Sequence, residues 1–166
     1  MDLKGRDLMF HIGDKIVHPM HGAGIVENIV HKQVGNQSQA YYVLNMPLAG
    51  MVIMLPIQSS KEIGVRPVID PMQADELMDK LGDIEVDMTQ NWNRRYRENM
   101  DRIKSGDLIE VARVVKGLMV RERERGLSTG ERKMLHSAKQ ILISELVMAK
   151  SSNYEEVEQK INKALA

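Results

Sequence analysis

The stretch RPVIDP at residues 66–71 divides the chain into two parts with different hydrophobic periodicity. Before it, β-branched and aromatic residues form short runs separated by glycine- and proline-containing turns, a pattern typical of strands. After it, apolar residues recur every three or four positions, which is typical of amphipathic helices. Asp70 can cap a helix that has Pro71 at its first position. We therefore expect an α+β fold in which a β module precedes a compact all-α module.

The expected strands are short, and turn residues separate them. They cover residues 15–18, 25–30, 40–46 and 51–55, and Pro56 ends the last one. Gly22-Ala23-Gly24 and Gly35-Asn36 are predicted as turns. Short strands with a turn about every ten residues are typical of a small barrel or a strongly curved sheet.

Four or five helices are expected after residue 70, with short connections between them. They run from 71 to 82, from 89–91 to 105, from 107 to 126, from 128 to about 150, and from 153 onward. Asp107 with Glu110, and Ser128 with Glu131, have the spacing of capping boxes. The helix after Asp107 carries apolar residues on several sides, so we expect it to be the central helix of the bundle.

The charge distribution supports a modular chain. We expect a β domain over residues 1–68, an acidic connector with a short helix over 69–90, and a helical domain over 91–166. Residues 71–90 hold one basic and six acidic side chains, whereas residues 91–166 have a surplus of five basic ones. The whole chain of 166 residues has no formal net charge. Only the last part is therefore expected to be drawn to a polyanion.

The composition argues against several classes of protein. The chain has 43% apolar and 28% charged residues, as in an ordinary globular protein, and no cysteine, which excludes disulfides and thiol catalysis. His18 and His21 form a close pair with no obvious further metal ligands, so they are interpreted as turn residues. No phosphate-binding loop or nucleophile elbow is present. We expect no enzyme activity, cofactor, metal or small-molecule substrate.

Membrane attachment is not expected either. No run approaches the about 18 apolar residues of a spanning helix, and residues 1–15 carry charge throughout, unlike a signal peptide. These features favour a cytoplasmic protein.

The segment Asn91-Trp92-Asn93-Arg94-Arg95-Tyr96-Arg97 is the most informative in the chain. It combines the single tryptophan with three arginines, a mixture suited to nucleic acid, because guanidinium groups bind phosphates and an exposed indole stacks on bases. The alternative is structural. Trp92 precedes Tyr96 by four positions and is in line with Met100 and Ile103, so spacing alone favours a buried indole. The arginines are expected to be exposed in either case.

A second basic patch follows in the helical part. It comprises Arg121, Arg123, Arg125, Arg132 and Lys133. Glu122 and Glu124 alternate with the first three, which is common on a solvated, salt-bridged face. At most, this composition supports sequence-independent contact with a phosphate backbone.

The run Met51-Val52-Ile53-Met54-Leu55-Pro56 is apolar on both faces of its expected strand. Such a strand is either central in its sheet or an edge strand kept for a partner. Pro56 is more typical of an edge, and a partner strand can add to an edge of this kind.

Four stretches in order, covering about residues 9–150, carry a family resemblance: Ile12 to Gly22, Tyr41 to Leu44, Trp92 to Tyr96, and Gly126 to Glu131. Together they resemble the CarD/CdnL family of bacterial RNA polymerase-binding transcription regulators. The first stretch alone would also resemble a module of the transcription-repair coupling factor, a far larger helicase. The Trp92 segment distinguishes the two.

The resemblance implies a small Tudor-like β-barrel that docks on the RNA polymerase β subunit, and a helical domain that reaches promoter DNA. It implies that Trp92 enters the minor groove at the upstream edge of the melted bubble, which reverses the preference from spacing. The DNA-contacting set is then Trp92, Arg94, Arg95, Arg97, Arg121 and Arg132. The polymerase-docking set is Lys32, Val34, Met51, Val52, Ile53, Met54 and Pro56. Some family members carry arginine at the position of Met54, so a hydrophobic contact is expected there instead.

The expected function is regulation of transcription initiation by a monomer that stabilises the open promoter complex. Docking on polymerase raises the local concentration of the factor, so weak, sequence-neutral DNA binding is sufficient. Two alternatives stay open: an autonomous non-specific DNA-binding protein, and a protein–protein adaptor in which Trp92 is buried.

Overall fold

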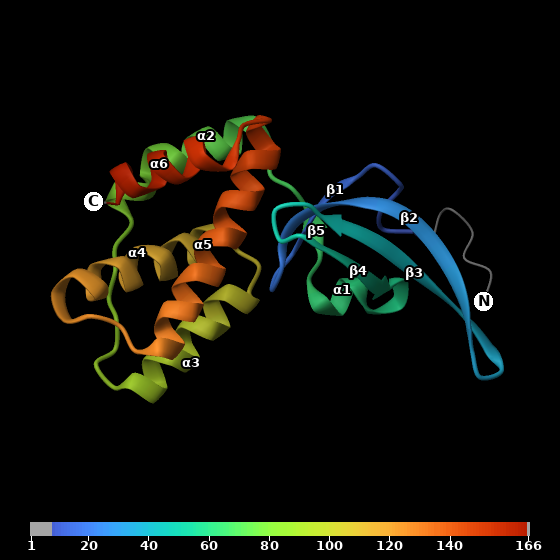
Figure 1. Cartoon of the computed structure of the whole chain (residues 1–166), viewed down its shortest axis with the longest axis horizontal. Coiled ribbons are helices and arrows are strands. Elements are labelled where there is room, and N and C mark those ends of the chain that lie inside the picture. Colours follow the sequence, from blue (N-terminus) through green and yellow to red (C-terminus); the bar gives the residue numbers. More distant parts are fainter. Residues whose placement is uncertain (1–7, 166) are drawn as a thin grey trace.

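The computed structural model describes residues 8–165, so residues 1–7 of the expected β domain and Ala166 of the expected helical domain lie outside the described residues. The described chain forms a sheet module at one end and a helical module at the other (Figure 1). Each module has its own hydrophobic core. The expected α+β fold is confirmed.

The described residues form a five-stranded antiparallel sheet in the order β4-β3-β2-β1-β5. The strands are β1 (Lys15–His18), β2 (Gly22–Val34), β3 (Gln37–Met46), β4 (Met51–Pro56) and β5 (Arg66–Pro67). β2 and β3 make a long hairpin that reaches away from the helical module (Figure 1). Its turn lies at Gly35-Asn36, as predicted, and Gly35 has a φ of 63°.

The predicted turn at Gly22-Ala23-Gly24 is wrong, because these residues begin β2. The turn lies just before them, where the His21 N–H donates to the His18 carbonyl over 3.2 Å. Gly24 is needed for close packing of strands: a Cβ atom there would lie 2.6 Å from the carbonyl oxygen of Asn45. A glycine inside a strand often marks such a close backbone approach.

A short helical segment that the sequence did not reveal closes the sheet module. It consists of the 3₁₀ helix η2 (Ile57–Ser59) and α1 (Ser60–Ile63), which ends at Gly64 with a φ of 90°. Ile57 is buried in the core of the sheet module, so this segment covers one end of that core.

The helical module contains α2 (Pro71–Lys80), η3 (Leu81–Asp83), α3 (Trp92–Lys104), α4 (Leu108–Arg125), α5 (Thr129–Lys150) and α6 (Tyr154–Ala164). Asp70 caps α2, as predicted, and Gln73 completes a capping box with it. Asp107 caps α4 through the Ile109 N–H, but Glu110 does not close a box, because its carboxylate lies 3.6 Å from both Arg102 and Arg113.

The central helix is α5, and the expectation that α4 is central is therefore wrong. α5 packs against α2, α4 and α6, and it also contacts β2 of the sheet module. Figure 1 shows α5 between the other helices and the sheet. Buried residues occur almost continuously from Ile141 to Leu146, because α5 is covered on both sides.

Candidate nucleic-acid and protein interfaces

Trp92 occupies the first position of α3, and its side chain is 42% exposed. The burial favoured by spacing alone is therefore wrong. Asn91 caps the helix by accepting a hydrogen bond from the Arg94 N–H over 3.0 Å. One face of the indole stacks on Tyr96, with ring centroids 5.2 Å apart and an interplanar angle of 21°. The indole thus lies at a helix end, where solvent or a ligand can reach it.

The exposed indole is held in place by polar and apolar contacts. Its Nε1–H donates to the Ser128 Oγ over 3.0 Å. Gly130 lies beside the two rings, where a Cβ atom would be at ordinary contact distances of 3.6 Å from Trp92 Cζ2 and 3.8 Å from Tyr96 Cε2. These contacts restrict the orientation of the indole without burying it.

Arg95 does not have the exposure that the sequence predicted, because its side chain is only 1% exposed. Its Nε and Nη2 donate to the two carboxylate oxygens of Glu131 over 2.8 and 3.1 Å. Its Nη1 donates to the carbonyls of Thr89 and Gln90 over 3.1 and 2.8 Å. The guanidinium is thus fully engaged within the protein, which removes Arg95 from the candidate DNA contacts.

Glu131 is the buried partner of this arginine and is 2% exposed. The hydrogen bonds from Arg95 lower the pKa of the Glu131 carboxyl, and burial opposes that effect. The Glu131 backbone N–H donates to the Ser128 Oγ over 3.2 Å. This is one of the two hydrogen bonds of the predicted capping box. The Glu131 carboxylate accepts hydrogen bonds from Arg95 and, over 3.5 Å, from the Ser128 hydroxyl, but it does not bind the Ser128 backbone N–H that would complete the box.

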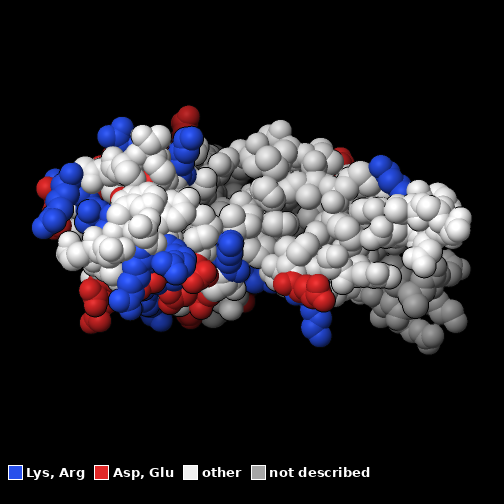
Figure 2. Space-filling model, turned by 90° about the horizontal axis from the view of Figure 1, so that it is seen from below, with Lys and Arg blue, Asp and Glu red and all other residues white. Residues whose placement is uncertain are grey.

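The other predicted arginines differ in their exposure. Arg94, Arg97 and Arg132 are exposed, although Arg94 pairs with Glu98 over 3.2 Å. Arg121 is half-buried with its Nε 4.0 Å from Glu131, and within residues 8–165 this Nε has no hydrogen-bond partner. Figure 2 shows lysine and arginine side chains gathered over the helical end of one face, while the sheet end of that face carries few.

The apolar strand β4 is an edge strand, which is the position that Pro56 favoured. Met51, Val52 and Met54 are exposed on it, and Val52 is exposed most, at 61%. Ile53 is half-buried and Leu55 is buried, so only part of the strand faces the core. Within the described chain, the outer side of β4 pairs with no other strand.

Lys32 and Val34 are exposed near the tip of the β2–β3 hairpin. On β3, Tyr41 pairs with Pro56, whereas Gln39 pairs with Lys32 and Gln37 with Val34. At about 3.4 Å per residue, Lys32 and Val34 lie about 7 and 14 Å beyond the end of β4 along the hairpin. The structure therefore places them beyond the end of β4, on β2, which β3 separates from the edge strand.

The two modules are joined by polar contacts that the sequence did not reveal. Arg66 on β5 makes two hydrogen bonds of 2.6 Å to Glu145 on α5, and its Nε donates to the Gly106 carbonyl over 2.8 Å. The Ala23 N–H on β2 donates to the Ser144 Oγ over 2.9 Å. A glutamate inside the apolar run ILISELV was the one signal in the sequence that pointed to such a contact.

Both modules match known family models. Residues 10–69 match the model described as "CarD-like/TRCF RID domain", and residues 76–162 match the model described as "CarD, C-terminal domain". The second match alone covers more than half of the chain. The chain belongs to the CarD family.

A curated relative of this CarD-family protein is the Bacillus subtilis (strain 168) protein named "Putative transcription factor YdeB". The two are 42% identical over 142 residues, which cover 86% of this chain and 93% of the relative. The family is one of transcription factors and is non-enzymatic. The expected resemblance is thus confirmed.

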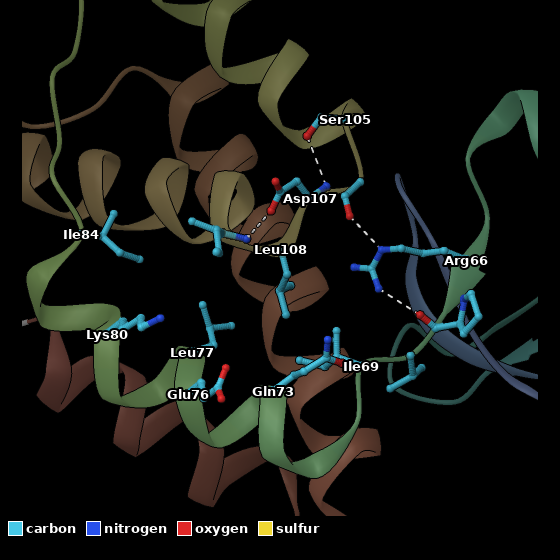
Figure 3. Close-up of a pocket in the computed structure, with 14 residues that line it drawn as sticks. Arg66, Ile69, Gln73, Glu76, Leu77, Lys80, Ile84, Ser105, Asp107 and Leu108 are labelled. Atoms are coloured by element: carbon cyan, nitrogen blue, oxygen red, sulfur yellow. Dashed lines mark hydrogen bonds between the residues drawn. The ribbon is translucent and has the colours of Figure 1, made fainter.

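The CarD-family chain also has a cavity of about 680 Å³ between α2 and the turn that joins α3 to α4. Leu77, Leu108, Ile69 and Ile84 supply apolar walls, and Glu76, Gln73 and Lys80 lie along α2 beside them (Figure 3). Arg66 borders the cavity on the side of the sheet, where it is engaged by Glu145 and Gly106. The cavity therefore lies where the two modules join.

Residues 8–165 hold no group of three histidine, aspartate or glutamate side chains placed to bind a metal ion. None of the helices formed by these residues is long and apolar enough to cross a membrane.

Proposed function

We propose that this protein regulates transcription initiation by docking on the RNA polymerase β subunit and stabilising the open promoter complex with Trp92. The observation that carries the proposal is the exposed indole at the start of α3, fixed by Ser128 and Tyr96 beside exposed arginines. A large aromatic side chain that is exposed yet oriented is suited to stacking on or wedging between bases.

The sheet module supplies the polymerase-docking surface in this proposal. The docking residues are Lys32, Val34, Met51, Val52, Ile53, Met54 and Pro56. The RID match supports this assignment, because that domain is the polymerase-interacting one. The unpaired outer side of β4 could accept a partner strand, and Met54 would contribute a hydrophobic contact where some relatives carry arginine.

The helical module supplies the DNA-contacting surface. We assign Trp92 to the minor groove at the upstream edge of the melted bubble, and Arg94, Arg97, Arg121 and Arg132 to the phosphate backbone. The exposure of Arg94, Arg97 and Arg132 supports these contacts, whereas Arg121 needs some rearrangement because it is half-buried. Contacts of this type position a protein on DNA without reading its sequence.

The mechanism follows from a shift of populations. A factor that touches only the melted promoter stabilises it over the closed form by its differential contact energy. A stacked indole contributes about 1–3 kcal/mol, equivalent to about 5- to 150-fold in the open-to-closed ratio. Polymerase docking keeps the factor at the promoter, so the module over residues 91–166 needs no high affinity for DNA of its own.

The proposal keeps the modular division of the chain at 1–68, 69–90 and 91–166, with the connector packed onto the helical module, whose core includes Ala74, Leu77 and Leu81. The first boundary is supported by the end of β5 at Pro67 and the start of α2 at Pro71. The factor would act as a monomer in the cytoplasm, at the nucleoid, where polymerase and promoter DNA meet.

The test is the lifetime of open promoter complexes formed by polymerase with the Trp92→Ala variant. We expect the variant to keep its helix content and its recovery with the β subunit, but to shorten the lifetime by about 5-fold or more. An unchanged lifetime with normal recovery would overturn the DNA part of the proposal. Recovery of DNA without the β subunit would instead favour an autonomous DNA-binding protein.

A further inference from the structure

A buried ion pair lies under the exposed indole. Arg95 in α3 and Glu131 in α5 meet through two hydrogen bonds of 2.8 and 3.1 Å, and both side chains are at most 2% exposed. The proposed function makes no use of either residue. Arg95 lies one helical turn after Trp92 in α3, so the pair is placed to support the indole.

Arg95 first fixes the chain that leads into α3. Its Nη1 donates to the carbonyls of Thr89 and Gln90, the two residues before the cap Asn91. The Thr89 hydroxyl in turn donates to Glu98 over 2.8 Å. The start of α3, which carries the Trp92 backbone, is thus tied to its own helix at two points.

Glu131 fixes the other support of the indole. Its carboxylate accepts the Ser128 O–H over 3.5 Å, and its backbone N–H donates to the same Oγ over 3.2 Å. This oxygen also accepts the Trp92 Nε1–H over 3.0 Å. A continuous set of hydrogen bonds therefore runs from the residues before α3 through Arg95, Glu131 and Ser128 to the indole.

Stability alone does not require this pair. Replacing a buried ion pair with apolar side chains of similar volume is often neutral or stabilising, because the charges no longer have to be desolvated. Apolar side chains, however, could not donate to the Thr89 and Gln90 carbonyls. A planar guanidinium with several fixed donors can bind a carboxylate and two carbonyls at once.

We propose that Arg95 and Glu131 are positioning residues that hold the Trp92 indole in a fixed orientation on the protein surface, ready to engage melted DNA. The DNA half of this inference rests on the proposed function, and the orientation half does not. A side chain held in advance loses less freedom on binding, so its contact contributes more to the bound state.

The experiment uses the full-length protein and the fluorescence of Trp92, which is the single tryptophan of the chain. Time-resolved anisotropy without DNA or polymerase measures how far the indole moves relative to the whole protein. The main variant replaces both partners, Arg95→Met with Glu131→Leu. A second variant, Arg95→Lys, keeps the charge but provides one point cation in place of the planar fork.

A matched control removes the pair of Arg66 with Glu145, in which the glutamate is buried and the arginine is partly exposed. The double substitution Arg66→Met with Glu145→Leu likewise replaces an arginine and its α5 glutamate with apolar side chains. Neither residue belongs to the set of hydrogen bonds that leads to Trp92. In this control the anisotropy decay of Trp92 should show no more of a fast component than in the wild-type protein.

We expect the Arg95→Met/Glu131→Leu variant to keep its helix content and to gain a fast anisotropy component from a mobile indole. Arg95→Lys should show a smaller fast component. The lifetime of the open promoter complex should fall more in the double variant than in Arg95→Lys. The largest fall should not exceed that of Trp92→Ala, which is expected to be about 5-fold or more. Recovery of the β subunit should stay unchanged.

Three outcomes separate the two halves of the inference. If either variant folds and its indole stays as rigid as in the wild-type protein, the positioning role is overturned. A mobile indole with a shortened lifetime supports both halves. A mobile indole with an unchanged lifetime supports positioning and contradicts the proposed role of Trp92 at the promoter.

Discussion

Arg66 on β5 and Glu145 on α5 form a two-pronged ion pair across the boundary between the sheet and helical modules, with both N–O distances at 2.6 Å. The Glu145 side chain is fully buried, and it also accepts the Ile69 N–H over 3.0 Å. Ser144, the preceding residue, binds the backbone of β2. Consecutive residues of α5 thus set the orientation of the sheet, and with it of the proposed docking strand β4, relative to Trp92.

The Glu145→Ala variant should be strongly destabilised, because it leaves the Arg66 guanidinium without its partner. Removing one partner of a buried pair costs about 3–5 kcal/mol, and the partial exposure of Arg66 favours the lower end. Urea denaturation followed by circular dichroism measures the loss. Glu155→Ala, on the exposed face of α6, is the control and should change the free energy of unfolding little. A loss at Glu145 no larger than at Glu155 would contradict the importance of the pair.

The Met54→Glu variant should lose recovery of the RNA polymerase β subunit while keeping its helix and strand content. The reason is that a carboxylate would have to be desolvated in an apolar contact on the edge strand. Met72→Glu is a matched control, because Met72 is exposed on α2, away from the sheet. Pull-down with purified polymerase measures the effect. Equal recovery of both variants would refute docking through β4.

His18 should make the stability of the protein depend on pH. Burial, followed by the nearby His21, lowers the pKa of His18 to about 4 from an ordinary 6.5. Between these values the unfolded chain binds a proton that the folded protein does not. The free energy of unfolding should therefore fall as the pH drops from about 6.5 to about 4, by up to about 3 kcal/mol.

Urea denaturation at several pH values tests this dependence in the wild-type protein and in two variants. His18→Asn should flatten the slope, because it removes the titrating group but can still accept a hydrogen bond from the Met20 N–H. His136→Gln should keep the slope, because His18 is still present. A wild-type stability that does not change over this range would contradict the prediction.

The Gly24→Ala variant should be destabilised by about 1–3 kcal/mol, because the added methyl group would meet the Asn45 carbonyl at 2.6 Å and the chain would have to shift. Gly82→Ala is the matched control, since a Cβ atom there would lie at an ordinary 3.5 Å from the nearest atom. Thermal unfolding of both variants measures the difference. A Gly24→Ala protein as stable as Gly82→Ala would show that the sheet accommodates the methyl group.

The elements that depend on neighbours in the sequence could be predicted. The change of periodicity at residues 66–71, the caps Asp70 and Ser128, and the Gly35-Asn36 turn all lie where their local pattern places them. Pro56 also marked β4 correctly as an edge strand. Local hydrogen bonds and backbone preferences act over a few residues, so a single sequence carries them.

What the sequence could not determine is which face of α3 is covered. Spacing placed Trp92 on the buried stripe and the arginines in solvent, yet Trp92 is 42% exposed and Arg95 is buried. The outcome depends on α5, which brings Glu131 against Arg95 from 36 positions away and leaves the indole at the margin of the contact. In the same way, Glu145 meets Arg66 across 79 positions.

The sequence by itself therefore determined the two modules, most of their helices and strands, and the family to which the chain belongs. Tertiary structure alone decided which of its arginines are available to DNA and how the two proposed surfaces are oriented. The physical reason is that burial of a charged group is favourable only when a distant partner compensates its desolvation, and such a partner has no fixed spacing along the chain.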